Sequence, residues 1–249
     1  SLPLVKDSKN FKKILNPKLA LKLAPNYTKD YRNQDIKIDI DNIYSLNRVQ
    51  QSDMVEGGLS LTYGNDFSIF DKKNLRDTFN FKIANNFRLS ENKDLPTNSQ
   101  IGQKTSSIVN EISYKPSDMI KLEYNSSIKN NLTDINYENL ITEFKVNNLV
   151  TSFEYLNQNN SPGNNDSFLS NKTELFVNDS NSFSFSTRRN KTIDLTEYYN
   201  LAYQYKNDCL TASIEYNKEY YSDKDIRPNE SLLLNLKIIP FNRNNNLNF

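Results

Sequence analysis

Few residues of this 249-residue chain could carry out chemistry. The sequence contains no His and a single Cys, which excludes Ser-His and Cys-His catalysis, His-ligated metals, zinc-thiolate sites and an internal disulfide. Carboxylate chemistry, for instance by a pair of Glu side chains, would remain. The acidic residues, however, are spread over every predicted strand, with no Gly-rich loop or nucleophile elbow beside them. The sequence therefore predicts a protein that is not an enzyme, with no catalytic residue, no cofactor and no metal.

The charge balance argues against a nucleic-acid partner. The 31 basic and 30 acidic residues leave a net charge of +1, which gives no electrostatic footprint for nucleic acid. The mean hydropathy is negative and no apolar run reaches the roughly 18 residues of a transmembrane helix, so a helical span is excluded. A membrane β-barrel is not excluded, because its strands alternate between apolar and polar residues and average out as polar.

The elements that position the charged residues are predicted to be strands. From Leu59 onward, apolar residues recur at every second position, as in Phe79, Phe81 and Ile83, and a helical period of 3.6 fits none of these runs. We count about 12 strands by this alternation, with one more at 18–24. Most have about 10 residues or more, the length that a tilted membrane strand needs, whereas soluble strands usually have about five or six.

The connections between these strands alternate in length. Tight polar turns are predicted at 115–118, 147–148, 178–180 and 206–208, and longer loops near 90–104, 129–134, 158–166 and 221–228. Residues 1–241 have no domain boundary and are predicted to be one barrel region. Within it, 25–58 should form a long ordered loop that can include a short strand at Ile36–Ile40, and 1–16 a frayed remnant of an earlier strand. Residues 242–249 are predicted to be a flexible tail.

Apolar residues at every second position, with polar residues on the other face, fit both a soluble antiparallel sheet and a membrane barrel. The long strands, the alternation of short turns with long loops and the placement of tyrosines favour the membrane. Tyr114, Tyr203 and Tyr205 adjoin tight turns, while Tyr216 and Tyr220 approach a long loop, as expected of the two girdles at membrane interfaces. We therefore predict an all-β fold, an antiparallel up-and-down transmembrane β-barrel.

The polar face of the predicted strands carries charges of both signs. Facing lipid, a Lys or Arg would cost about 2–4 kcal/mol at the bilayer centre and a Glu somewhat less, whereas facing a wet lumen these residues are tolerated and can pair with one another. For each charged residue taken alone, the alternative is that it lies on a solvated face and has no role beyond solubility. The residues predicted to line a large hydrated lumen are Lys82, Glu111, Lys121, Glu123, Glu143, Lys145, Glu154, Lys172, Glu174, Arg188, Glu215 and Lys237.

Seven segments of the chain, taken in order, carry a resemblance to a known family. They are Asn42–Arg48, Asp53–Gly58, Leu61–Gly64, Ser106–Val109, Tyr114–Asp118, Leu201–Cys209 and Glu215–Pro228. These segments resemble the LptD family of outer-membrane proteins that assemble lipopolysaccharide (LPS). The likeness runs from about Pro17 to Pro240, with departures at Gln51, where the family usually has a small residue, and at Lys218, where Arg is common.

The resemblance implies the C-terminal half of a barrel with about twice this many strands. The function that it implies is transport: acyl chains pass through a lateral gate into the membrane while the sugars cross the lumen. The implied partners are LPS, outer-membrane lipids, a plug lipoprotein similar to LptE and a periplasmic LPS bridge protein, and the implied location is the bacterial outer membrane. The implied sites are a motif loop with Asn42, Asn47, Arg48, Asp53, Glu56 and Gly57, and a gate strand, Ser231–Pro240, with Leu232, Leu234, Leu236 and Ile238.

Cys209 is predicted to begin a strand directly after a tight turn, on the polar face. In the family a Cys at this place pairs with the periplasmic domain. The resemblance therefore implies a disulfide whose partner lies outside this chain, and an oxidising periplasm would favour it. A free, buried thiol is the alternative.

Two other classes of protein remain open. A passive porin or nutrient-receptor barrel would need a complete strand set and a constricting loop. A soluble β-sandwich or adhesin-like binding module would extract as a monomer without detergent.

Overall fold

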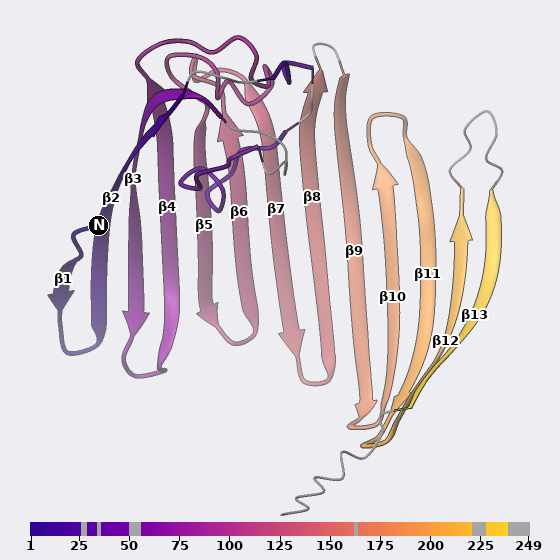
Figure 1. Cartoon of the computed structure of the whole chain (residues 1–249). Coiled ribbons are helices and arrows are strands. Elements are labelled where there is room, and N and C mark those ends of the chain that lie inside the picture. The colour runs from indigo at the N-terminus through magenta and orange to yellow at the C-terminus, as the bar shows by residue number, and fades with distance from the viewer. Residues whose placement is uncertain (26–28, 34–35, 50–55, 162–163, 221–227, 239–249) are drawn as a thin grey trace, which may run out of the picture. The chain divides into compact units, whose positions relative to one another are not determined.

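In the computed structural model, the chain consists of β-strands and their connections. The structure describes residues 1–25, 29–33, 36–49, 56–161, 164–220 and 228–238. Across these residues, thirteen strands follow one another in an up-and-down order that equals their order in the sequence, as predicted (Figure 1). No helix in this described part could cross a membrane. The strands are β1 (Leu4–Asp7), β2 (Phe11–Ala24), β3 (Gly58–Asp71), β4 (Arg76–Arg88), β5 (Ile108–Ser117), β6 (Ile120–Ile128), β7 (Ile135–Val146), β8 (Leu149–Ser161), β9 (Asn164–Asn178), β10 (Asn181–Asn190), β11 (Leu195–Lys206), β12 (Leu210–Glu219) and β13 (Asn229–Ile238).

The chain divides into two compact units. The first unit comprises Ser1–Thr142 and Glu154–Ser167, and the second comprises Glu143–Phe153 and Phe168–Phe249. Within each unit, short turns such as 118–119 and 207–209 join the strands at one end, and the connections at the other end are mostly longer. We call these the short-turn end and the loop end.

The first unit contains the antiparallel sheet β1–β6, whose two faces differ. The register aligns Leu21, Leu61 and Phe87 on one face, because these residues are direct partners on β2, β3 and β4. Leu21 is 71% exposed on this apolar face. The opposite, polar face carries the charged and hydroxyl side chains of the same strands. Strict alternation of hydrophobicity therefore becomes two chemically distinct surfaces.

The buried core of the first unit lies between the polar face and a loop, not between two sheets. Ile38, Ile43 and Val49, from the segment that connects β2 and β3, are buried with Ala84 and Val109 of the sheet. Residues 29–33, 36–49 and 56–57 of this connection form no strand. The connection thus covers one end of a face that would otherwise be open to water.

The second unit repeats the two-faced pattern across β9–β13. One row of direct partners runs through Leu175, Phe183, Tyr203, Ile214 and Leu234, so that every strand contributes an apolar side chain. The rings of Phe183 and Tyr203 lie 5.1 Å apart between centroids, as aromatic cross-strand pairs do. Among the described residues, β13 pairs only with β12, which leaves its outer edge without a partner strand.

Several tyrosines lie near the strand ends, although Tyr63 and Tyr155 lie near the middle of β3 and β8. Tyr114, Tyr203 and Tyr205 are close to the short-turn end of β5 and β11. Tyr216 and Tyr220 are close to the loop end of β12. Amphipathic rings in two such bands match the two interfaces of a bilayer.

The N-terminal residues depart from the prediction. Residues 1–16 form β1 and the first part of β2 rather than a frayed remnant, and β2 begins at Phe11 instead of residue 18. Pro17 does not interrupt β2, because its carbonyl accepts a hydrogen bond from the N–H of Leu2, at 3.3 Å. Its backbone therefore faces β1, and the missing N–H removes nothing from the ladder between β2 and β3.

Two further predictions about the connections are wrong. No strand forms at Ile36–Ile40, because Asp39 and Asn42 bind each other's backbone N–H groups, at 3.1 and 3.0 Å, and hold this stretch in a turn. The loop expected near 158–166 is shorter, since β8 continues to Ser161 and β9 starts at Asn164. The expected tail at 242–249 lies outside the described residues.

Candidate functional site

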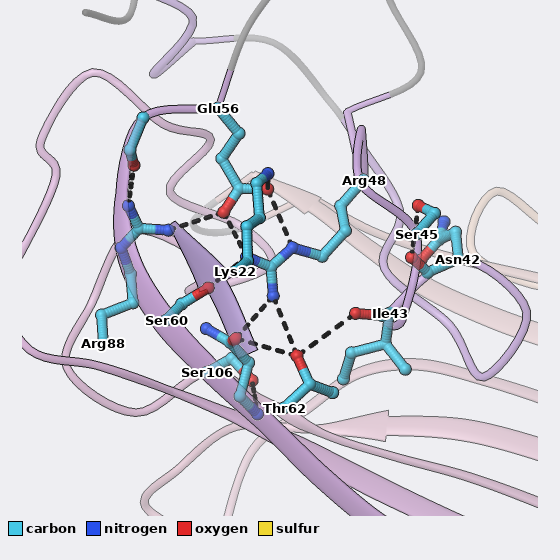
Figure 2. Close-up of polar contacts among 12 residues, drawn as sticks. Lys22, Asn42, Ile43, Ser45, Arg48, Glu56, Ser60, Thr62, Arg88 and Ser106 are labelled. Atoms are coloured by element: carbon cyan, nitrogen blue, oxygen red, sulfur yellow. Dashed lines mark hydrogen bonds and ion pairs between the residues drawn. The ribbon is translucent and has the colours of Figure 1, made fainter. Parts of the chain in front are cut away.

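The motif loop brings Arg48 and Glu56 together on the polar face of the first unit, at the loop end (Figure 2). Arg48 Nε donates to Glu56 Oε2 at 2.8 Å, and Arg48 Nη2 donates to the other carboxylate oxygen. Their side chains are only 1% and 0% exposed. This two-pronged, charge-assisted contact fixes both planar groups at once.

The sheet supplies two more cations to the same carboxylate. Arg88, at the end of β4, places Nη1 2.6 Å from Glu56 Oε1, and Lys22 of β2 places Nζ 2.9 Å from Oε2. Arg88 Nη2 also donates to the carbonyl oxygen of Gly57. Glu56 therefore ties the loop to two strands (Figure 2). We call Lys22, Arg48, Glu56 and Arg88 the buried ion cluster.

Polar groups of β3 and β4 satisfy the rest of the Arg48 guanidinium. Its Nη2 donates to Ser60 Oγ at 2.9 Å, and its Nη1 donates to Asn86 Oδ1 at 2.5 Å. Thr62 Oγ1 donates to the same amide oxygen at 3.1 Å. Buried charge is tolerated only when hydrogen bonds replace the lost water, and the strands provide them here.

The electrostatics keep Glu56 ionised. Burial alone would raise the pKa of Glu56, but the hydrogen bond and charge of Arg48, together with those of Lys22, outweigh it and hold the pKa below its ordinary value. The buried ion cluster contains three cations and one anion, so removal of this carboxylate would leave three like charges close together.

A second loop residue, Tyr44, fits against a glycine of the sheet. A Cβ on Gly64 would clash with the Tyr44 hydroxyl and with the carbonyl oxygen of Ile83. Burial, and then the negative charge of Asp66, raise the pKa of Tyr44 to about 12. The neutral phenol therefore packs onto the sheet where no side chain intervenes.

The other motif-loop residues have different surroundings. Asn42 Nδ2 donates to the carbonyl of Lys37 at 2.9 Å and shapes the turn before Ile43. Asn47 is half-buried, and Asp53 lies outside the described residues. Of the motif-loop residues, the structure thus gathers Arg48, Glu56 and the Gly57 carbonyl at one place.

Most of the predicted lumen charges have oppositely charged or polar partners on the polar face. Lys82 and Glu111 are direct cross-strand partners at 2.8 Å, and Arg188 Nε lies 2.9 Å from Glu197. Such partly exposed pairs contribute about 0–1 kcal/mol each, so their effect is to balance charge rather than to stabilise. The other contacts join Lys121 to Glu123 at 2.8 Å, Lys172 to Glu174 at 2.7 Å, Glu154 to Asn139 at 2.9 Å, and Glu215 to Ser213 and Asn235 at 3.0 and 3.1 Å. Glu143 is half-buried on β7, while Lys145 on β7 and Lys237 on β13 are exposed.

The predicted gate side chains lie on β13. Leu232, Leu234, Leu236 and Ile238 share one face and are 64–77% exposed. Their direct partners on β12 include Tyr216 and Ile214. An edge strand with exposed aliphatic side chains and an unpaired ladder side can accept another strand or a lipid chain.

Cys209 lies in the turn at the short-turn end, one residue before β12 begins at Leu210. It is not the first residue of the strand, because its N–H donates to Asn207 Oδ1 at 2.9 Å within the turn. Its thiol is free within this chain and half-buried.

Sequence reasoning missed part of the buried ion cluster. Lys22 and Arg88 belong to it but were not singled out as candidate site residues. The sequence offers only a weak signal, because both occupy an ordinary polar position of the alternation, near a strand end that leads into a long connection: Lys22 lies between Leu21 and Leu23, and Arg88 lies between Phe87 and Leu89. The described residues hold no group of three or more acidic, Cys or His side chains that could bind a metal ion.

Comparison with known protein families matches the chain to the family described as LptD, LPS transport system D. The match covers residues 1–245 and so includes every strand from β1 to β13, the buried ion cluster and Cys209. A comparison with curated proteins finds no match.

Proposed function

The chain belongs to the LptD family, LPS transport system D, and on that premise we propose that it forms the C-terminal half of an outer-membrane translocon barrel. In this proposal the barrel inserts LPS into the outer leaflet through its lumen and a lateral gate. The protein acts as a conduit and carries out no reaction. Its location is the bacterial outer membrane.

The observation that supports this proposal best is the contrast between the two faces of the sheet. An amphiphile such as LPS needs an apolar surface for its acyl chains and a wet, polar surface for its sugars. The apolar face, with tyrosines near both ends, suits contact with lipid. The polar face, with its balanced pairs such as Lys82 and Glu111, suits a hydrated lumen.

The edge of β13 is the proposed gate. Its side chains from Leu232 to Ile238 are apolar, and its outer edge has no partner strand among the described residues. In a larger barrel this edge would meet the first strand, and the seam between them would open to let acyl chains through. The ladder of β12 and β13 would remain intact while the seam opens.

The proposed partners follow from the same arrangement. LPS and outer-membrane lipids contact the two faces, a plug lipoprotein similar to LptE occupies the lumen, and a periplasmic bridge protein delivers LPS. In the proposed barrel, the short-turn end of the strands faces the periplasm. Cys209 would then form its disulfide there, with a cysteine outside this chain.

Site-specific photo-crosslinking in living cells tests the proposal. A photoreactive amino acid replaces Glu215 on the polar face of β12, and in a matched variant it replaces Ala212 on the apolar face near the short-turn end. We expect LPS adducts at position 215 that disappear when LPS supply is blocked, and none at position 212. Absence of adducts at 215, together with ion conductance through the purified protein, would favour a passive porin instead.

A further inference from the structure

The first unit carries two lysines side by side on its apolar face, and we propose that this lysine pair binds the phosphate of an anionic glycerophospholipid. Lys6 of β1 and Lys13 of β2 are direct cross-strand partners and are both exposed. They lie on the apolar face because Lys13 is an even number of residues from Leu15 and Leu21 along an unbroken register. The pair thus lies where the proposed barrel would touch lipid.

The lysine pair is at the short-turn end of the sheet. Residues 8–10 join β1 to β2 at the same end at which 72–75 join β3 to β4, and the Lys72 N–H donates to the Asn10 carbonyl at 2.9 Å (Figure 1). Lys6 is the last residue but one of β1, and Lys13 is the third residue of β2. Tyr114 lies near the same end of β5. The ammonium groups are therefore expected at the level of lipid headgroups and not among the acyl chains.

No charge in the described part of the chain neutralises the lysine pair. Like charges directly opposite one another across two strands repel, and their Cβ atoms are only about 5 Å apart. Neither ammonium group forms an ion pair with another described residue, and Lys9 in the connection between β1 and β2 is exposed and unpaired in the same way. An anion between Lys6 and Lys13 would replace this repulsion by attraction.

The neighbouring acidic groups are bound elsewhere. Asp7 lies on the polar face, where its carboxylate forms an ion pair with Lys72. Asp71 lies on the apolar face, but its Oδ1 accepts hydrogen bonds from the N–H groups of Lys73 and Asn74, at 2.9 and 3.3 Å. Residues 1–13 contain four lysines and one aspartate, whereas the whole chain has a net charge of +1. The surplus of positive charge therefore belongs to this hairpin.

The surroundings of the lysine pair suit a lipid better than a free anion. Phe11 and Leu15 lie on either side of Lys13 on the same face, and each is 39% exposed. These side chains can pack against acyl chains while the lysine stems extend along them to the phosphate. Inorganic phosphate would leave the apolar surfaces uncovered. A zwitterionic lipid brings its own cation, whereas phosphatidylglycerol brings only the phosphate charge.

The choice between two kinds of phosphate-bearing lipid rests on the proposed function. In the proposed barrel the short-turn end faces the periplasm, and LPS is inserted into the outer leaflet at the other end. The phosphates of lipid A are then at the loop end, and glycerophospholipids are at the short-turn end. The lysine pair therefore meets a glycerophospholipid of the periplasmic leaflet.

Native mass spectrometry of the protein in a neutral detergent tests this site. The native protein is titrated at low ionic strength with phosphatidylglycerol, phosphatidylcholine or lipid A, and the dissociation constant of the first bound lipid is measured. The test variants are Lys13→Gln and the double change Lys6→Gln with Lys13→Gln. Lys12→Gln is the matched control, because it removes the same charge one residue away, on the polar face. Lys13→Arg changes the side chain but keeps the charge.

We expect phosphatidylglycerol to bind the parent more tightly than phosphatidylcholine. Lys13→Gln should weaken phosphatidylglycerol binding about 5-fold and the double variant about 25-fold, whereas Lys12→Gln and Lys13→Arg should stay within about 2-fold of the parent. Equal weakening by Lys13→Gln and Lys12→Gln would mean attraction by net charge alone and would overturn the site. Lipid A binding that is tighter and falls by the same factor in Lys13→Gln would overturn the assignment to a glycerophospholipid.

Failure of this inference differs from failure of the proposed function. Absence of LPS adducts at position 215, with phosphatidylglycerol binding that depends on Lys13 and not on Lys12, would refute transport and leave the lipid site. Normal adducts, with Lys13→Gln binding phosphatidylglycerol like Lys12→Gln, would refute the lipid site and leave transport.

Discussion

Replacement of Glu56 by Gln should detach the long connection from the sheet. The substitution keeps the size of the side chain but removes the only negative charge of the buried ion cluster. Lys22, Arg48 and Arg88 would then face one another, and the new amide N–H₂ would face donors instead of accepting from them. The strands themselves should remain paired, since their ladders do not involve this side chain.

The magnitude follows from the geometry. Glu56 accepts four charge-assisted hydrogen bonds, two from Arg48, one from Arg88 and one from Lys22, and it is fully buried. Loss of one partner of a buried ion pair typically costs about 3–5 kcal/mol. The population of the open loop should therefore rise by roughly two to four powers of ten.

Limited trypsin digestion measures this population, because cleavage in a loop tracks the fraction of open molecules when opening is fast. Protein in membranes is digested under conditions where the parent is stable, and cleavage after Arg32, Lys37 and Arg48 is followed by mass spectrometry. Glu174→Gln is the matched control: its side chain is 33% exposed and pairs with Lys172, so its loss should cost less than about 1 kcal/mol.

A double variant separates anchoring from a general loss of stability. Arg48→Met combined with Glu56→Gln removes both partners, so it should cost less than the sum of the single changes. Cleavage of Glu56→Gln at the parent rate, or strictly additive effects in the double variant, would refute the anchoring role of the buried ion cluster.

Three further changes test other parts of the structure. The pKa of Glu56 is depressed in the folded protein, so its carboxylate stabilises the fold fully at neutral pH, and this stabilisation is lost as pH falls through the lowered pKa. The backbone amides of 36–49 should therefore keep their protection from hydrogen exchange at pH values down to about 4.3, the ordinary pKa of a Glu side chain. Opening of this segment at or above that pH would contradict the prediction. Gly64→Ala should destabilise the fold by about 1–3 kcal/mol, because the new methyl group meets Tyr44 and the backbone of Ile83, and an unchanged thermal unfolding temperature would count against that packing. The native protein should migrate differently on reducing and non-reducing gels while its Cys209→Ser variant does not, and identical migration of the parent under both conditions would exclude the disulfide.

The strands were predictable because their side chains alternate, residue by residue, between an apolar and a polar environment. Runs such as Phe79–Ile83 predict a strand from their alternation alone, and the register then follows from keeping the apolar positions on one face. The start of β2 was not predictable in this way. A proline such as Pro17 normally ends a strand. Pro17 does not interrupt β2, because its backbone points toward β1 and not toward β3.

The candidate site was less predictable than the sheet. The resemblance singled out Arg48 and Glu56 in a loop, but nothing in their spacing says that they meet, since the contact depends on how the loop folds back onto the sheet. Lys22 and Arg88 come from strands far away in sequence, and only the register brings them to the same carboxylate.

Labelling along β10 is the sharpest test of whether the two-faced sheet lies in a membrane. Single cysteines replace Ser182, Phe183, Ser184, Phe185 and Ser186 in the native protein in intact outer membranes, and the signal of Cys209 in the parent is subtracted. We expect a water-soluble maleimide to label the three serine positions, whereas the two phenylalanine positions should react only with a lipid-soluble reagent. Equal labelling of all five positions by the water-soluble maleimide would mean that both faces are in water and would contradict the membrane barrel.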